Sequence, residues 1–177
     1  MSSIRACALP EEALLSKYAR AGAYTDCYTI EIAKTVSHAA YVEAFYTCGL
    51  FKLERFLLSW LVFKPSTDAQ ARELASGASG TFAAWRVEER SANQLLMCDF
   101  LGRTRSWLMI GPPSNGGAVG TRLYFGTAVM PVRDKVSGQA RMGLAFKSLL
   151  GFHKLYSRAL LSAARSRLTR IASTEQS

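Results

Sequence analysis

The sequence is poor in the residues that bind metal ions or build disulfide frameworks. It contains two histidines and four cysteines in 177 residues. The cysteines are Cys7, Cys27, Cys48 and Cys98, so no two stand in a C-x-x-C pair, and no H-x-x-x-H spacing occurs. Zinc and copper sites usually need such close spacings. We therefore expect no metal and no cofactor, and we expect reduced cysteines that are mostly buried.

Long apolar runs are also missing. The most apolar stretch, FLLSWLVF at 56–63, is eight residues long, whereas a membrane-spanning helix needs about twenty. The opening MSSIRACALPEE reaches Pro10 and two glutamates before an apolar run of signal-peptide length develops. We therefore expect a soluble protein without a transmembrane segment, located most simply in the cytoplasm.

Loop motifs that bind phosphate or hold a nucleophile are absent as well. The chain has no G-x-S-x-G, no G-x-x-x-x-G-K-S/T and no G-x-G-x-x-G, which excludes a nucleophile elbow, a P-loop and a dinucleotide fingerprint. The net charge of +9 bears on solubility and association, not on the fold. Because no nucleic-acid-binding module is recognisable, we expect no specific nucleic-acid partner.

The length and composition indicate one globular domain over residues 1–177. Hydrophobic residues make up 49% of the chain and charged residues 20%, which is an ordinary globular balance. Residues 10–21 are predicted to form an amphipathic helix, part of an N-terminal extension over 1–22. The next segment, YTDCYTIEI at 24–32, alternates apolar residues as a strand does.

A pair of helices is predicted after this strand. Ser37 can cap the first of them, and Gly49 is expected to break the helical stretch in two. The apolar face shared by both helices consists of Val42, Phe45, Tyr46, Leu53, Phe56, Leu57 and Trp60. His38, at the helix start, is expected to face solvent. A capping box at Thr67 and Gln70 predicts a short third helix that runs to Ala75 and ends at Gly77.

From residue 81 the hydrophobic period becomes that of strands. Four segments separated by short turns show it: FAAWRVEER, QLLMCDFL, TRSWLMI and TRLYFGTAVMPV. Short turns join antiparallel neighbours, so we expect a four-stranded meander that completes the region 24–130.

The last predicted element is a long helix over 144–170. Its apolar arc contains Phe146, Leu149, Leu150, His153, Tyr156, Leu160, Leu161, Ala164 and Leu168, and its cationic stripe contains Lys147, Lys154, Arg158 and Arg165. Burial of the arc on the sheet is the expected outcome. Two alternatives remain open, peripheral contact with a membrane surface and binding of an acidic partner by the stripe.

These elements predict an α+β fold in which a curved antiparallel sheet grips the C-terminal helix. The order of these elements resembles that of the START-like helix-grip superfamily (SRPBCC). The segments GRTRSWLMI, TRLYFGTAVMPV and LLGFHKLYSRALLSAAR resemble a bacterial branch of this superfamily. That resemblance implies a hydrophobic or amphipathic ligand between the sheet and the last helix, and some members are cyclases or dehydratases. The N-terminal helix departs from the usual arrangement.

Candidate ligand-binding residues lie on the strands and on the last helix. They are Trp85, Trp107, Tyr124, Phe125, Phe146, Leu149, His153, Tyr156 and Leu160. Alternation sends Trp107 and Met109 to one face of their strand and Ser106 and Leu108 to the other, but it does not say which face is inside.

His153 is the most informative polar residue, because it falls within the apolar arc. It can be a core histidine bonded to a backbone carbonyl, or it can act on a ligand with Tyr156 and with Asp99 as the partner carboxylate. Asp99 can instead pair with Arg103 or Arg105.

Three functions therefore stay open: a non-enzymatic carrier or sensor of a hydrophobic molecule, a cyclase or dehydratase, and an interaction module for an acidic partner. The sequence indicates no oligomeric state.

Overall fold

A computed structural model describes residues 3–52, 66–115, 119–133, 140–141 and 144–174. The strands are β1 (Arg5–Ala6), β2 (Tyr24–Ile32), β3 (Thr81–Phe82), β4 (Trp85–Arg90), β5 (Gln94–Asp99), β6 (Thr104–Gly111), β7 (Thr121–Val129), β8 (Val132–Arg133) and β9 (Ala140–Arg141). The helices are α1 (Ser16–Arg20), α2 (His38–Thr47), α4 (Asp68–Ser76) and α5 (Leu144–Thr174).

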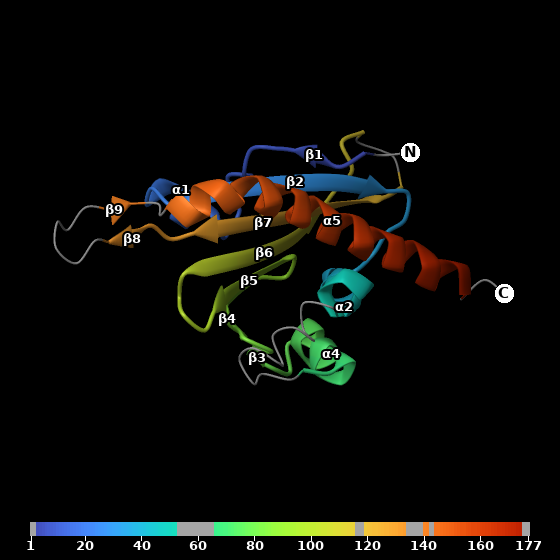
Figure 1. The fold of residues 1–177 in the computed structure, drawn as a ribbon. Coiled ribbons are helices and arrows are strands. Elements are labelled where there is room, and N and C mark those ends of the chain that lie inside the picture. The colour runs from blue at the N-terminus through green and yellow to red at the C-terminus, as the bar shows by residue number, and fades with distance from the viewer. Residues whose placement is uncertain (1–2, 53–65, 116–118, 134–139, 142–143, 175–177) are drawn as a thin grey trace.

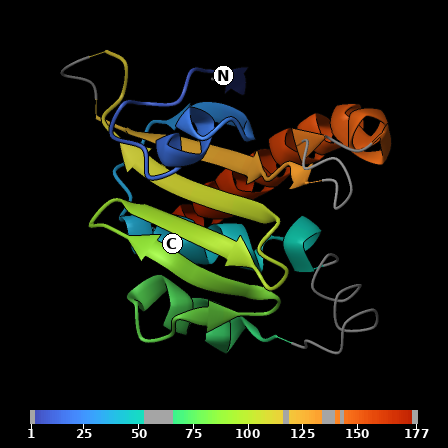
Figure 2. The ribbon, with the colours of Figure 1, turned by 90° about the vertical axis from the view of Figure 1, so that its left-hand side faces the viewer.

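The strands form a seven-stranded antiparallel sheet in the order β1-β2-β7-β6-β5-β4-β3, and β8 pairs with β9 separately. Helix α5 crosses one face of the sheet, and α2 and α4 lie on the same side (Figure 1). The view in Figure 2 shows the opposite face, against which α1 packs. The expected α+β class, with an antiparallel sheet and a long C-terminal helix, is confirmed.

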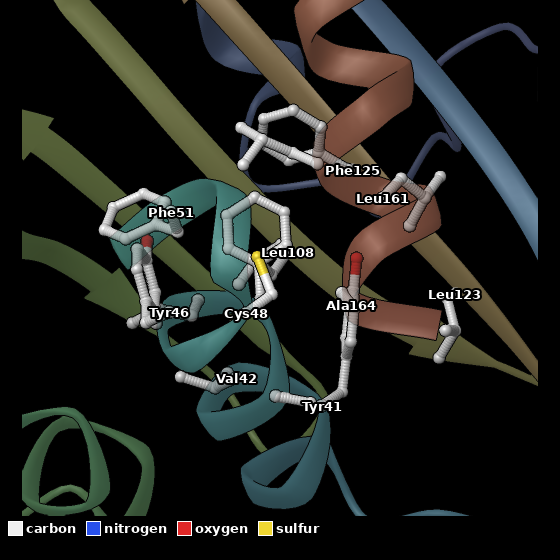
Figure 3. Close-up of a cluster of buried hydrophobic side chains, with 14 of the residues drawn as sticks. Tyr41, Val42, Tyr46, Cys48, Phe51, Leu108, Leu123, Phe125, Leu161 and Ala164 are labelled. Atoms are coloured by element: carbon white, nitrogen blue, oxygen red, sulfur yellow. The ribbon is translucent and has the colours of Figure 1, made fainter. Parts of the chain in front are cut away.

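The main core lies between the sheet and the three helices α2, α4 and α5. Tyr41 and Tyr46 of α2, Leu108 and Phe125 of the sheet, and Leu161 of α5 are all buried there (Figure 3). Each such side chain contributes roughly 1.5–3 kcal/mol by leaving water. Four residues of the predicted apolar arc of α5 are therefore buried against α2 and the sheet, as expected: Leu160, Leu161, Ala164 and Leu168. The side chain of Leu150, like those of the arc residues before it, lies outside the described part of the molecule.

A second, smaller core covers the outer face of the sheet. Leu15 and Ala13 of the N-terminal segment pack there with Trp107, Met109 and Tyr124. Gln94 links the N-terminal segment to the sheet, because its Oε1 accepts hydrogen bonds from Leu14 N and Trp107 Nε1, both at 2.9 Å.

Local sequence signals are confirmed at several element ends. The strand at 24–32 has the predicted bounds. Ser37 caps α2 by accepting from the backbone N–H of Ala40. The capping box of Thr67 and Gln70 is formed, and Gly77 ends α4 with a φ of 86°. The meander of β4, β5, β6 and β7 is antiparallel throughout.

The N-terminal extension differs from its prediction. Only Ser16–Arg20 is helical, because Leu14 N and the carbonyl of Glu12 bond to Gln94 and Ala13 N donates to Pro10 O in a turn. The short strand β1, which pairs with β2 at the sheet edge, was not predicted.

The first meander segment is two strands instead of one. Ala83 has a φ of 52°, a left-handed conformation that interrupts a strand. The chain turns back there, so that Phe82 lies opposite Trp85 and β3 pairs with β4.

The region around α2 also differs. The helix ends at Thr47 with Cys48 as its C-cap, and helical structure resumes at Gly49, so the predicted break lies one residue earlier than Gly49. His38 is buried and not solvent-facing, since the first turn of α2 packs on β6. Leu53, Phe56, Leu57, Trp60 and the stretch 56–63 lie outside the described residues.

Candidate functional site

A cavity of about 180 Å³ lies between the sheet, the α2 region and α5. We call it the grip cavity. Its apolar lining consists of Phe45, Phe51, Trp85, Phe125, Tyr156 and Leu160. Its polar and charged lining consists of Thr104, Arg105, Ser106, Thr127, His153 and Ser157. The cavity thus combines aromatic walls with a polar side.

Strand register explains this division. Ser106 lies opposite Thr127, and Leu108 lies opposite Phe125. Directly opposite residues in an antiparallel pair point to the same face, so β6 and β7 present a polar pair next to an apolar pair. The polar pair lies toward the start of β6, where α5 brings His153 and Ser157 to the same cavity.

Five predicted ligand-binding residues line the grip cavity: Trp85, Phe125, His153, Tyr156 and Leu160. Trp107 and Tyr124 do not, because they point to the outer face and pack with the N-terminal segment. The inner face of β6 is therefore the one that carries Ser106 and Leu108. The side chains of Phe146 and Leu149 lie outside the described part of the molecule.

His153 takes part in a hydrogen-bonded chain with Thr127 and Asp26. Asp26 Oδ1 accepts from Thr127 N at 3.1 Å and from Thr127 Oγ1 at 2.7 Å. Thr127 Oγ1 lies 2.8 Å from His153 Nε2. Because the threonine proton goes to Asp26, Oγ1 accepts from the imidazole, which fixes the proton on Nε2. The core-histidine hypothesis, with a bond only to backbone, does not describe this contact.

The second carboxylate oxygen of Asp26 is a buried polar atom of this hydrogen-bonded group. Oδ2 is buried and accepts no hydrogen bond from the described residues, and it lies 3.5 Å from His153 Nε2. The Asp26 side chain is 8% exposed. The Tyr24 ring meets the His153 ring edge-on at 6.4 Å. Burial, followed by the charge of Asp26, raises the pKa of Tyr24 to about 12, so this phenol keeps its proton at neutral pH.

Asp99 does not have either predicted role. Its Oδ1 accepts from the backbone N–H groups of Arg103 and Thr104, at 2.7 and 3.1 Å. These bonds hold the turn between β5 and β6. Arg105 pairs instead with Glu88, with Nε 3.0 Å from Oε2. The carboxylate beside His153 is therefore Asp26, and the assignment to Asp99 was wrong.

Asp26 was missed although the sequence carries a signal for it. In β2 the side chains of Tyr28, Ile30 and Ile32 are buried in the main core. Asp26 is the next residue in the same alternating series, so it shares their face. An acid in the inward series of a strand is rarely buried without a partner.

A second depression, a groove of about 550 Å³, lies on the other side of Asp26. It runs between the β1–β2 edge and α5, and its lining includes Tyr24, Asp26, Tyr28, Lys154 and Arg158. Two cations of the predicted stripe are therefore exposed along one groove. Arg165 is half-buried, and the side chain of Lys147 lies outside the described part. An acidic partner for these cations remains a prediction.

Within the described ranges, no group of three His, Cys, Asp or Glu side chains is placed to hold a metal ion. Among the described residues, no helix combines the length and the apolar character that crossing a bilayer requires.

Comparison with protein families, curated proteins and solved structures finds no match to this chain. The similarity to the START-like superfamily therefore remains a prediction from the sequence.

Proposed function

We propose that this protein binds a small hydrophobic or amphipathic molecule in the grip cavity and acts as its carrier or sensor, without catalysis. The observation that supports this proposal is the lining: aromatic side chains such as Phe45 and Phe125 on one side, with Thr127 and His153 on the other. An apolar protein cavity of about 150 Å³ accommodates benzene. The 180 Å³ found here suits a single ring or a short chain with one polar group.

Native mass spectrometry tests whether the cavity is filled. Protein purified under native conditions should carry a small extra mass that disappears after extraction with organic solvent. The emptied protein should then take up p-cresol or indole, two single-ring probes with one polar group, as followed by calorimetry. An emptied protein that takes up neither probe argues against the proposal.

A pair of variants on α5 locates the binding. Ser157 is buried and lines the cavity, whereas Ser162 is exposed on the same helix. Ser157→Phe should fill the cavity and weaken p-cresol binding at least tenfold. Ser162→Phe adds the same ring outside and should leave binding unchanged. Equal affinity in the two variants would show that the probe binds elsewhere.

A second candidate is acid–base catalysis of the cyclase or dehydratase type. The hydrogen bonds that link Asp26, Thr127 and His153 favour this enzymatic function, because a buried carboxylate orients the imidazole beside the cavity. Tyr156 lines the same cavity, and its phenol would be a further proton donor in such a reaction.

This enzymatic candidate is tested on the molecule that the protein retains. If His153 transfers a proton during a reaction, the wild-type protein should release a product and His153→Gln should release its unreacted precursor. A dehydration would appear as the loss of one water between the two masses. If both proteins release the same molecule, the non-enzymatic carrier function is favoured over catalysis.

A further inference from the structure

Cys7 and Cys27 face each other at the edge of the sheet. Ala6 lies opposite Tyr28 in the β1–β2 register, so the following residue, Cys7, reaches Cys27. Cys7 N donates to Cys27 O at 3.0 Å, and the two Sγ atoms are 3.2 Å apart. Opposed residues of antiparallel strands have Cα atoms about 4.5–5.5 Å apart, which lies within the range that a disulfide bridges.

The surroundings distinguish this pair from the other two cysteines. Cys48 is buried in the main core, and Cys98 is buried with its thiol directed to the carbonyl of Asp99. Cys27 is buried on the outer face, and Cys7 beside it is half-buried. A small oxidant therefore reaches the pair through Cys7.

Cys7 is also the thiol that ionises first. The hydrogen bond between Cys7 and Cys27 lowers the pKa of Cys7, burial opposes this, and the positive charge of Arg122 lowers it further. The bond to Cys7 and burial raise the pKa of Cys27. Because the thiolate is the nucleophile in thiol chemistry, Cys7 attacks and Cys27 resolves.

We propose that Cys7 and Cys27 form a reversible disulfide that fastens the N-terminal segment to β2. With hydrogen peroxide as the oxidant, the Cys7 thiolate attacks one oxygen and the O–O bond breaks, which leaves a sulfenic acid at Cys7 and releases hydroxide. The Cys27 sulfur then attacks the Cys7 sulfur, and the S–O bond breaks. Each peroxide thus oxidises two thiols to one disulfide and yields two waters.

The bond would close a loop that contains α1 and Leu15, which cover the outer face of the sheet. A cross-link of this kind restricts the unfolded chain more than the folded one. We expect the melting temperature to rise by roughly 5–10 °C on oxidation.

Thiol counting and peptide mapping test the proposal on the full chain. After reduction, removal of the reductant and treatment with hydrogen peroxide, the thiols titrated in denaturant should fall from four to two. Trypsin cuts after Arg5, Lys17, Arg20 and Lys34, so the two cysteines lie in peptides 6–17 and 21–34. These peptides should appear joined, two hydrogens lighter than their sum, and should separate on reduction.

Variants provide the controls. Cys7→Ser should give no joined peptide and no rise in melting temperature on oxidation, because the half-buried position tolerates serine. Cys48→Ala, or Cys98→Ala if the former does not fold, should still form the bond. Four titratable thiols after peroxide, or a bond between other cysteines, would overturn the proposal. A Cys7–Cys27 bond without a rise in melting temperature would overturn the fastening role.

Discussion

Asp26 of β2 and His153 of α5 come from opposite ends of the chain, yet Oδ2 of the aspartate lies 3.5 Å from Nε2 of the histidine. Thr127 of β7 joins them through its hydroxyl. The group sits between the grip cavity and the groove, because Asp26 lines the groove and His153 lines the cavity. A molecule bound in the grip cavity and a molecule bound in the groove would therefore both lie next to this group of Asp26, Thr127 and His153.

Thr127→Val should destabilise the protein by about 1–3 kcal/mol, because it keeps the shape but removes a hydroxyl bonded to a buried carboxylate. Urea unfolding of wild type, Thr127→Val, Asp26→Asn and the double variant measures this loss and the coupling between the two residues. Additive losses in the double variant would show that the hydroxyl does not support Asp26.

Stability should fall in acid because of His38. Burial, which a hydrogen bond to the backbone of Leu108 partly offsets, lowers the pKa of His38 from 6.5 to about 4. Between these two values the unfolded chain binds the proton and the folded protein does not. Stability is thus fully present above pH 6.5 and is lost as the pH falls toward 4, by about 3 kcal/mol.

The comparison that isolates this effect uses His38→Gln. Chemical denaturation between pH 4 and 7 should give a free energy of unfolding that depends less on pH in the variant than in the wild type. Parallel curves for the two proteins would assign the acid sensitivity to other groups.

Gly126→Ala should cost about 1–3 kcal/mol of stability. A Cβ at Gly126 would lie 2.9 Å from the carbonyl oxygen of Asp26 and 3.0 Å from both Leu15 and Trp107. Gly151→Ala is the matched control, because nothing lies within 4 Å of its Cβ and the site is inside α5. It should stabilise by about 0.5–1 kcal/mol. Thermal melts of the two variants that shift in the same direction would contradict this reading of the packing.

Gln94→Leu should loosen the N-terminal segment. Gln94 Oε1 accepts from Leu14 N and Trp107 Nε1, and its Nε2 donates to the carbonyl of Glu12 at 3.0 Å. Loss of this side chain leaves buried groups unpaired, at a cost of about 2–3 kcal/mol. Limited trypsin digestion should show faster cleavage at Lys17 and Arg20 than in the wild type. Unchanged cleavage would mean that apolar contacts alone hold the segment.

Local signals located most of the elements. Alternation identified β2, and the side chains of Ser37 and Thr67 marked two helix starts, because a cap or a strand period depends on residues that are close in sequence. The same reasoning failed for residues 10–21. There the apolar spacing suits a helix, but bonds to the distant Gln94 replace helical ones.

The sequence by itself determined which residues share a face and which helix is amphipathic, because these depend on periods of two and 3.6 residues. Tertiary structure alone decided that Ser106 faces inward and Trp107 outward, since both faces of the sheet carry a core. It also decided that His153 meets Asp26 instead of Asp99. That choice depends on where α5 crosses β2 and β7, and long-range packing sets this position.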